Sequence, residues 1–426
     1  MKRATIWIAA ILAIGLDNFA GAQVNFRGFV LNQDMFQANE SLNAMLIRNR
    51  LRLNTEISGE NVSGFASLDI TNDITDSATT LPNLREAYID IYSSWLDLRI
   101  GKQQVVWGKT DGYFINDIVN PLDLSYFLLQ DFDDIRMATT MLNAKLHHGN
   151  HSLEMLVIPE FKPMNLLFEG DWGYERPDSQ IITLPFIGDL SIPMNYKDDV
   201  QTDYSLRKSE LGLRFSTFLF GTDLSLMYLK IREDRPVYFT QLTTNEYGVP
   251  VRVDLTPTHP WQHFFGLNFS KPAGAFVFRG EGGYYPERHF NTENTAYLTK
   301  GMIVEKPFSQ IMLGADYQLS SSLDLSIQGI NERIIDYETG IQNDENVSLG
   351  TVLIRGHFFN ETVSPLFFRL YNFKDLSSLT RLSVDWNYAD NFTITVGADF
   401  LSGESNSMFG MYDDNDNIYL KVKYSF

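Results

Sequence analysis

The chain has 426 residues, of which 44% are hydrophobic and 13% aromatic, and its formal net charge is -19. So acidic a protein is repelled by nucleic acid, which excludes a nucleic-acid partner. With 0 cysteines, the sequence also excludes disulfides, thiolate metal sites, cysteine nucleophiles and covalently attached haem.

The N-terminus has the organisation of a secretory signal. A basic head, Met1-Lys2-Arg3, precedes an apolar stretch over residues 4–16 and the small-residue cleavage motif Ala20-Gly21-Ala22. An N-terminal anchor helix is the alternative, but Asp17 and the cleavage motif disfavour it. We therefore predict a cleaved signal peptide at 1–22 and one domain over 23–426.

The rest of the chain alternates polar and apolar residues, which is the pattern of β-strands. Near residue 51, for example, Leu51, Leu53 and Ile57 share one parity, and arginines occupy the other. We predict strands near 24–35, 43–57, 62–71, 84–92, 96–104, 136–147, 152–158, 206–219, 222–232, 262–271, 275–287, 309–318, 322–334, 350–359, 365–373, 379–388, 391–401 and 417–426.

The direction of burial separates a soluble sandwich from a membrane barrel. The polar faces carry several charges each, which the dry interior of a sandwich could not solvate but a water-filled barrel could. Tight turns also alternate with long polar connections, as in outer-membrane proteins. The predicted fold class is all-β: a transmembrane antiparallel β-barrel of about 18 strands, with 16 as the alternative.

The third long connection, residues 105–135, is unusually apolar. It contains Val105-Val106-Trp107-Gly108 and Tyr126-Phe127-Leu128-Leu129, which would be costly to expose to water. We expect it to fold into the lumen as a constriction loop, with a helical turn after Pro121; an apolar cap over the outer loops is the alternative. The residues expected to shape it are Trp107, Gly108, Asn120, Pro121, Asp123 and Arg136.

Charged residues of both signs fall on the lumen parity. Arg48, Arg50 and Arg52 form a ladder with steps of roughly 7 Å. Facing rows of opposite charge would orient polar solutes; the alternative is that the residues pair to rigidify the wall. Within strands, we expect Glu210 to pair with Arg214 and Arg279 with Glu281. The acidic residues predicted at the pore are Asp69, Glu86, Asp90, Asp131, Asp133 and Asp134.

Enzymatic and metal sites have weak support. Ser209 and His263 could approach at the outer rim as a hydrolase pair, but one such coincidence is poor evidence. The histidines at 147, 148 and 151 fit a solvated turn better than a metal site. The acidic stretch 413–417 fits a loop bridged by cations to lipopolysaccharide. We expect no catalytic residues, no metal and no cofactor.

Five parts of the sequence form recognisable motifs: Gly101 to Lys109, Asn120-Pro121-Leu122-Asp123, Phe132 to Arg136, Phe265 to Pro272 with Arg279-Gly280-Glu281, and Asn415 to Leu420. These motifs resemble a porin-like outer-membrane β-barrel family of unknown function, within the Gram-negative outer-membrane channel superfamily. The ending Tyr424-Ser425-Phe426 also resembles the C-terminal signal read by the outer-membrane assembly machinery. The resemblance implies a channel architecture in the outer membrane, without a defined substrate.

Three functions follow from this sequence. The first is a non-enzymatic channel for small hydrophilic solutes, narrowed by residues 105–135 and by the arginine ladder. The second is a plugged barrel that transfers hydrophobic molecules or lipids with a periplasmic or inner-membrane partner. The third is an interaction barrel that binds an external protein. The expected partners are the lipid bilayer, lipopolysaccharide, the assembly machinery, a small solute and, as alternatives, a homotrimer or a periplasmic transport partner.

Overall fold

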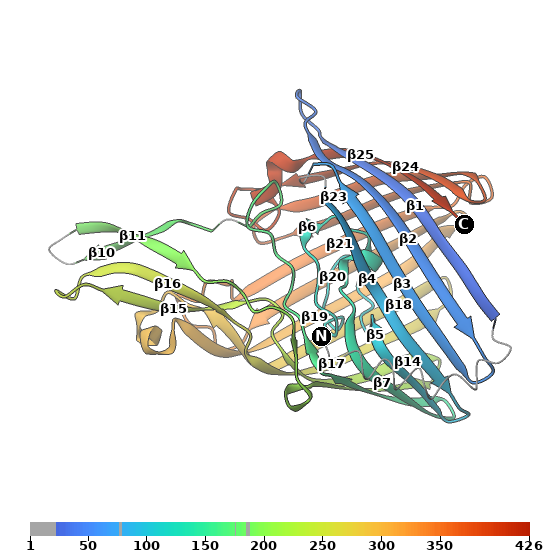
Figure 1. Ribbon diagram of the computed structural model, residues 1–426, viewed down its shortest axis with the longest axis horizontal. Coiled ribbons are helices and arrows are strands. Elements are labelled where there is room, and N and C mark those ends of the chain that lie inside the picture. The colour runs from blue at the N-terminus through green and yellow to red at the C-terminus, as the bar shows by residue number, and fades with distance from the viewer. Residues whose placement is uncertain (1–22, 76–78, 175, 185–187) are drawn as a thin grey trace.

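Eighteen antiparallel strands close into one barrel in the computed structural model, which describes residues 23–75, 79–174, 176–184 and 188–426 (Figure 1). Each strand pairs with its neighbours in sequence order, and β1 closes the barrel by pairing with β25. The predicted barrel of 18 strands is thereby confirmed. The signal peptide predicted at 1–22 lies outside the described residues.

The observed strands coincide with the predicted ones to within a few residues at most ends. They are β1 (Gln23–Gln37), β2 (Ala44–Ser58), β3 (Val62–Asp73), β4 (Thr79–Tyr92), β5 (Leu96–Gln103), β7 (Thr139–His148), β8 (His151–Ile158), β13 (Glu210–Leu219), β14 (Thr222–Arg232), β17 (Trp261–Ala273), β18 (Phe276–Asn291), β19 (Ile303–Ser320), β20 (Leu323–Ile334), β21 (Asn346–Gly356), β22 (Val363–Asn372), β23 (Ser378–Ala389), β24 (Phe392–Ser402) and β25 (Asn417–Ser425).

The alternation sorts the side chains as a membrane barrel requires. On β23 the outward Leu382, Val384 and Trp386 are each more than 40% exposed, a surface suited to acyl chains. On β2 the outward Leu53 is 39% exposed, whereas Arg50 and Arg52 face inward and are buried. Among the residues described, no helix is long and apolar enough to cross a membrane.

The two ends of the barrel differ. At one end, called here the short-turn rim, strands are joined by tight turns such as the one through Gly221, whose φ of +71° favours glycine. At the other end, the long-loop rim, most connections are longer, and three of them carry further strands. Short turns and long loops at opposite rims are the arrangement of outer-membrane barrels.

A four-stranded sheet projects from the long-loop rim (Figure 1). It is built from β10 (Ser179–Leu184), β11 (Gly188–Tyr196), β15 (Val237–Thr244) and β16 (Pro250–Thr258), with β11 and β16 running parallel. The sequence analysis placed these residues in polar loops, which was wrong. The sheet forms because Ile192, Val253 and Leu255 bury a small apolar core of their own.

The connection between β5 and β7 runs back into the lumen, so the predicted infolded third loop is confirmed. Residues 104–138, called here the infolded segment, contain the short strand β6 (Ser125–Leu128) and the single-turn helix α2 (Phe132–Ile135). The helical turn expected after Pro121 was wrong. There, Leu122 instead forms a bridge with Arg136, which holds the chain extended.

Much of the lumen around this segment is apolar, which the sequence analysis did not predict. One cluster contains Ile115, Phe127 and Leu129 of the segment together with wall residues such as Met312 and Leu370. The other surrounds Trp107 and Val119. Wall and segment therefore share dry cores, and the segment is packed into the barrel as a domain core is packed.

Candidate functional site

The infolded segment is tied at its two ends by Asn120. The Asn120 side-chain oxygen accepts a hydrogen bond from Val105 N at 2.6 Å, and its amide donates to the Gln103 carbonyl at 3.2 Å and the Thr139 hydroxyl at 3.1 Å. Next to it, the carbonyl of Pro121 accepts from Met137 N at 2.8 Å. These bonds join the end of β5 to the start of β7, so the segment leaves and returns at one place.

Trp107 is the apolar anchor of the segment, with 1% of its surface exposed. It fits against β13 because position 212 is glycine; a Cβ there would lie 3.1 Å from the indole ring. The following Gly108 is equally restricted, since its Cβ would lie 2.7 Å from that of Asp117. The Trp107 carbonyl accepts from the Asn268 amide at 2.9 Å, which fixes the segment to β17.

Two charged wall residues bind the segment and not each other. Glu281 accepts hydrogen bonds from the backbone N–H groups of Lys109 and Asn116. Arg279 forms ion pairs with Asp111 of the segment at 2.6 Å and with Asp316 of β19 at 2.7 Å. The predicted Arg279–Glu281 pair was therefore wrong.

The other predicted in-strand pair was also wrong. Glu210 pairs with Arg232 at 3.3 Å, and Arg214 pairs with Glu154 at 2.6 Å. Both partners lie on neighbouring strands, because cross-strand neighbours on one face are closer than residues four apart along a strand.

The arginine ladder of β2 meets the helical turn of the segment. Asp134 pairs with Arg50 and, at 2.8 Å, with Arg52, which also holds Asp69 through two hydrogen bonds of 2.6 and 2.7 Å. Burial alone would raise the pKa of Asp134, but the two arginines hold it well below its ordinary value. Arg48 is different: its guanidinium donates to the Gln33 side chain at 2.7 Å.

The remaining predicted acidic residues do not form one row. Glu86 accepts from Gln104 N at 3.0 Å at the start of the segment. Asp131 pairs with Lys421 at 2.8 Å. Asp133 contributes its backbone carbonyl, which accepts from the Gln104 amide at 3.2 Å and from Arg85.

Asp90 lies apart from the ladder. It pairs with Arg99 at 2.6 Å, close to the short-turn rim, where it is opposite Ser63 of β3. A charge on lumen parity therefore does not by itself belong to the constriction.

Arg136, the last predicted residue of the segment, donates to Asp117 at 2.6 Å. Burial raises the pKa of Asp117 despite this ion pair. Asp123 accepts from Ser125 N at 3.1 Å and from the Asn165 amide at 2.8 Å. These contacts connect the segment to itself and to the loop that follows β8.

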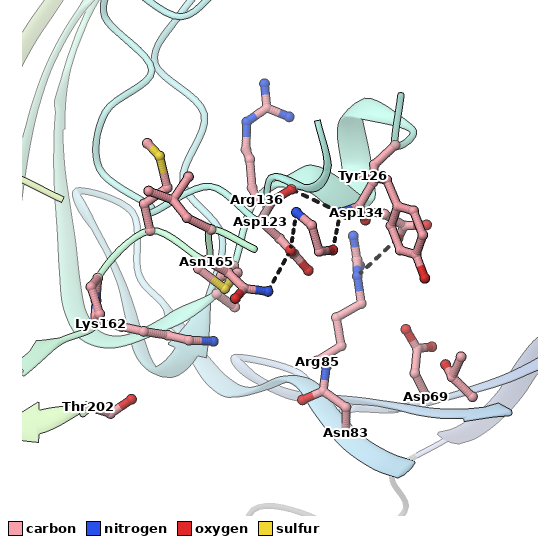
Figure 2. A pocket seen from close by; sticks show the side chains of 18 of the residues that line it. Asp69, Asn83, Arg85, Asp123, Tyr126, Asp134, Arg136, Lys162, Asn165 and Thr202 are labelled. Atoms are coloured by element: carbon pink, nitrogen blue, oxygen red, sulfur yellow. Dashed lines mark hydrogen bonds and ion pairs between the residues drawn. The ribbon is translucent and has the colours of Figure 1, made fainter. Parts of the chain in front are cut away.

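A cavity of about 590 Å³ remains between the infolded segment and the wall strands β2 to β5 (Figure 2). Residues 162–168 and 199–202, from the connection between β8 and β13, line its outer side. Most of the residues that line it are polar or charged, in contrast to the two apolar clusters elsewhere in the lumen. The side chains of Arg48, Arg50, Asp69 and Asp134 meet here, so the cavity adjoins the ladder.

Asp134 provides a test of this arrangement through pH. Since its pKa is lowered in the folded protein, the ion pair stabilises the fold above the ordinary carboxyl pKa of about 3.9 and is lost as the pH falls further. We expect Asp134→Asn to lower the free energy of unfolding by on the order of 2 kcal/mol at pH 7 and pH 5, and by less at pH 3. Denaturant unfolding in detergent micelles measures the free energy of unfolding of the variant and of the natural protein. If the difference between the two proteins disappeared as the pH fell from 7 to 5, the ion pair would not depend on a carboxylate with a lowered pKa.

The residues considered for catalysis are not brought together. The Ser209 hydroxyl donates to the Leu206 carbonyl at 3.1 Å, while His263 lies 2.9 Å from the hydroxyl of Tyr228. On the two strands that flank the turn between β7 and β8, His147 contacts Asp97 at 2.7 Å and His151 contacts Thr217 at 2.8 Å. Within the described ranges, no group of three or more His, Cys, Asp or Glu residues could hold a metal ion.

The last strand closes the barrel at its seam. Phe426 N donates to the Gly28 carbonyl at 3.0 Å, and Gly28 N donates to the Phe426 carbonyl at 2.9 Å. Tyr424 is opposite Val30 and points outward, 49% exposed. The geometry is compatible with the assembly role predicted for Tyr424 and Phe426, which stays a prediction.

The structure is a closed 18-strand antiparallel barrel narrowed by an infolded segment, which is a porin-like β-barrel fold. Three Pseudomonas aeruginosa structures share the fold and cover 95% of this chain and 98% of their own: OccK2 (OpdF) in complex with glucuronate, with TM-score 0.52 and 10% identity; OccK5 (OpdH), with 0.52 and 9%; and OccK1 (OpdK), with 0.50 and 9%.

The chain belongs to the family described as protein of unknown function DUF1302, whose model matches residues 17–354. The sequence resemblance to a porin-like family of unknown function is thereby confirmed. No curated protein matches the sequence.

Proposed function

We propose that this protein is a non-enzymatic outer-membrane channel for passive or facilitated diffusion of small hydrophilic solutes. The observation that carries the proposal is the polar cavity beside the infolded segment. A barrel of 18 strands is too wide for its wall side chains to fill, and the infolded segment leaves part of the remaining space open.

In this proposal, the infolded segment determines the width of the path that solutes take through the barrel, and the arginine ladder determines the electric field across that path. Arg48, Arg50 and Arg52 present cations on one wall, and Asp134 of the segment faces them. Charges fixed across a narrow passage favour dipolar solutes and disfavour apolar ones. The long-loop rim would face the cell exterior, and the signal peptide predicted at 1–22 would direct export in a Gram-negative cell.

The apolar clusters favour a second candidate, a plugged barrel that transfers a hydrophobic molecule with a periplasmic or inner-membrane partner. Ile115, Phe127 and Trp107 pack against wall residues with almost no exposed surface. A segment held so firmly could act as a plug, and its apolar surface could accept an apolar cargo if the segment moved.

Conductance in planar lipid bilayers separates the two candidates. The channel proposal predicts discrete conductance steps when the purified protein inserts, and a reversal potential in a salt gradient that reports the sign of the filter. A protein that inserts and stays folded but never conducts would overturn the channel proposal and favour the plugged barrel.

A further inference from the structure

In the cavity beside the infolded segment, the acidic side chains are all bonded to donors of the protein, whereas some of the basic side chains are not paired with a carboxylate of the described residues. Six basic side chains and four carboxylates line it, in a chain whose net charge is -19. All four carboxylates are engaged by donors of the protein. Asp134 is held by Arg50 and Arg52, Asp69 by Arg52, Asp123 by Ser125 N and Asn165, and Asp199 by His259 at 2.8 Å and Val200 N at 2.7 Å.

Three of the six cations have no carboxylate of the described residues in ion-pair contact. Arg48 donates only to Gln33, and its buried Nε has no hydrogen-bond partner among the described residues. Lys102 donates to a backbone carbonyl, that of Leu84, at 2.6 Å. Lys162 forms no hydrogen bond or ion pair within the part of the chain that the structure describes. An unneutralised cation in a partly enclosed site favours an anionic ligand.

The positions of these cations suit one ligand. Lys102 is the last residue but one of β5, Arg48 lies on β2 against the ring of Tyr126, and Lys162 enters from the connection after β8. In Figure 2 the ammonium group of Lys162 projects between the side chains of Thr202 and Arg85. The three cations therefore lie on different sides of one space, and the cavity volume of about 590 Å³ is typical of small-molecule sites.

Neutral polar groups complete the lining. Asn83, Thr71 and Thr202 face the cavity, and their side chains form no hydrogen bond with the rest of the described chain. Amides and hydroxyls that are free to donate and accept suit the hydroxyl groups of a polyhydroxylated solute.

We propose that this cavity is a binding site for a small hydroxylated carboxylate, with Lys162 and Lys102 receiving the carboxylate, and with Arg48 and the amide and hydroxyl side chains receiving the hydroxyl groups. The proposal deepens the proposed function and rests on it, because the site lies on the outer side of the constriction, where a solute entering from the long-loop rim would first be held.

Calorimetric titration of the full-length protein in detergent micelles tests this site without requiring conduction. We expect glucuronate to bind. Glucose, its uncharged analogue, should bind at least roughly tenfold more weakly, because a tenfold change in affinity is the contribution expected of one charge-assisted hydrogen bond. Lys162→Gln should weaken glucuronate binding by a similar factor. Lys197→Gln, in the same connection but outside the cavity, is the matched control and should leave binding unchanged.

Equal binding of glucose and glucuronate, or unchanged affinity in Lys162→Gln, would overturn the site. Inorganic phosphate binding more tightly than glucuronate would overturn the carboxylate class. The two proposals fail separately: a protein that binds glucuronate but never conducts loses the channel and keeps the site, and one that conducts without binding glucuronate loses the site and keeps the channel.

Discussion

Replacing residues 105–137 with a short glycine-serine turn is expected to raise single-channel conductance several-fold and to weaken ion selectivity. The replacement is geometrically simple because Gln103 of β5 is already paired with Thr139 of β7. Without the segment, the wall of an 18-strand barrel leaves an open aqueous bore. Planar-bilayer recordings measure both quantities, after heat-modifiable migration on a denaturing gel has shown that the barrel is closed.

The control for this variant removes a shorter stretch of chain outside the barrel. Residues 240–255, the outer part of the β15–β16 hairpin, can be replaced by the same turn, and conductance should then stay near that of the natural protein. Equal conductance in the segment replacement and the natural protein would show that current does not pass along the lumen.

Arg381→Met is expected to destabilise the folded barrel by about 3–5 kcal/mol. Arg381 pairs with Asp399 at 2.9 Å, the Asp399 side chain has 0% of its surface exposed, and Arg381 also donates to the Leu129 carbonyl of the infolded segment at 2.9 Å. Removing the arginine leaves a buried carboxylate unpaired and releases the segment from β23. Denaturant unfolding in detergent micelles gives the difference.

An exposed arginine of the wall provides the comparison. Arg27 pairs with Glu56 at 3.9 Å, with 72% and 45% of the two side chains exposed, so Arg27→Met should cost no more than about 1 kcal/mol. Removing both charges, as in Arg381→Met with Asp399→Leu, should restore much of the lost stability. If Arg381→Met cost no more than Arg27→Met, the buried pair would not be holding the segment.

The barrel was predictable because its signal is local. Alternation with period two appears within each strand, and the turn residues that separate strands are read from a few positions, so the number of strands followed directly. The infolding of the third loop was also predictable, since Trp107 and the run Tyr126 to Leu129 would be costly in water.

The apolar lining of the lumen was not predictable in this way. On β14 the run Leu226-Met227-Tyr228-Leu229 is apolar on both parities, so alternation does not assign a side. The structure places Met227 and Leu229 inside the barrel, where they are buried, and Leu226 outside, 55% exposed. What decides between the sides is the infolded segment: its Trp107 shares an apolar cluster with Met227 and Leu229 and lies more than a hundred residues before them in sequence.

The partners of charged residues depend on the same distant contacts. Glu281 binds the backbone of Lys109 and Asn116, a choice that the sequence near Glu281 does not contain. Parity places the ladder of Arg48, Arg50 and Arg52 in the lumen. The position of α2 in the folded barrel decides that Arg50 and Arg52 pair with Asp134 and that Arg48 has no carboxylate partner among the described residues. The sheet of β10, β11, β15 and β16 was missed because its two hairpins come from separate connections.

The shared dry cores have a consequence for how this protein reaches its native state. If all the barrel strands paired first, while residues 104–138 were still outside the lumen, the barrel would enclose water against Met312, Leu370 and their apolar neighbours. Such an intermediate is disfavoured for the same reason that any wetted core is. Insertion of the infolded segment and closure of the β1–β25 seam should therefore be cooperative. A folding intermediate that stalls before completion should have neither the inserted segment nor the closed seam.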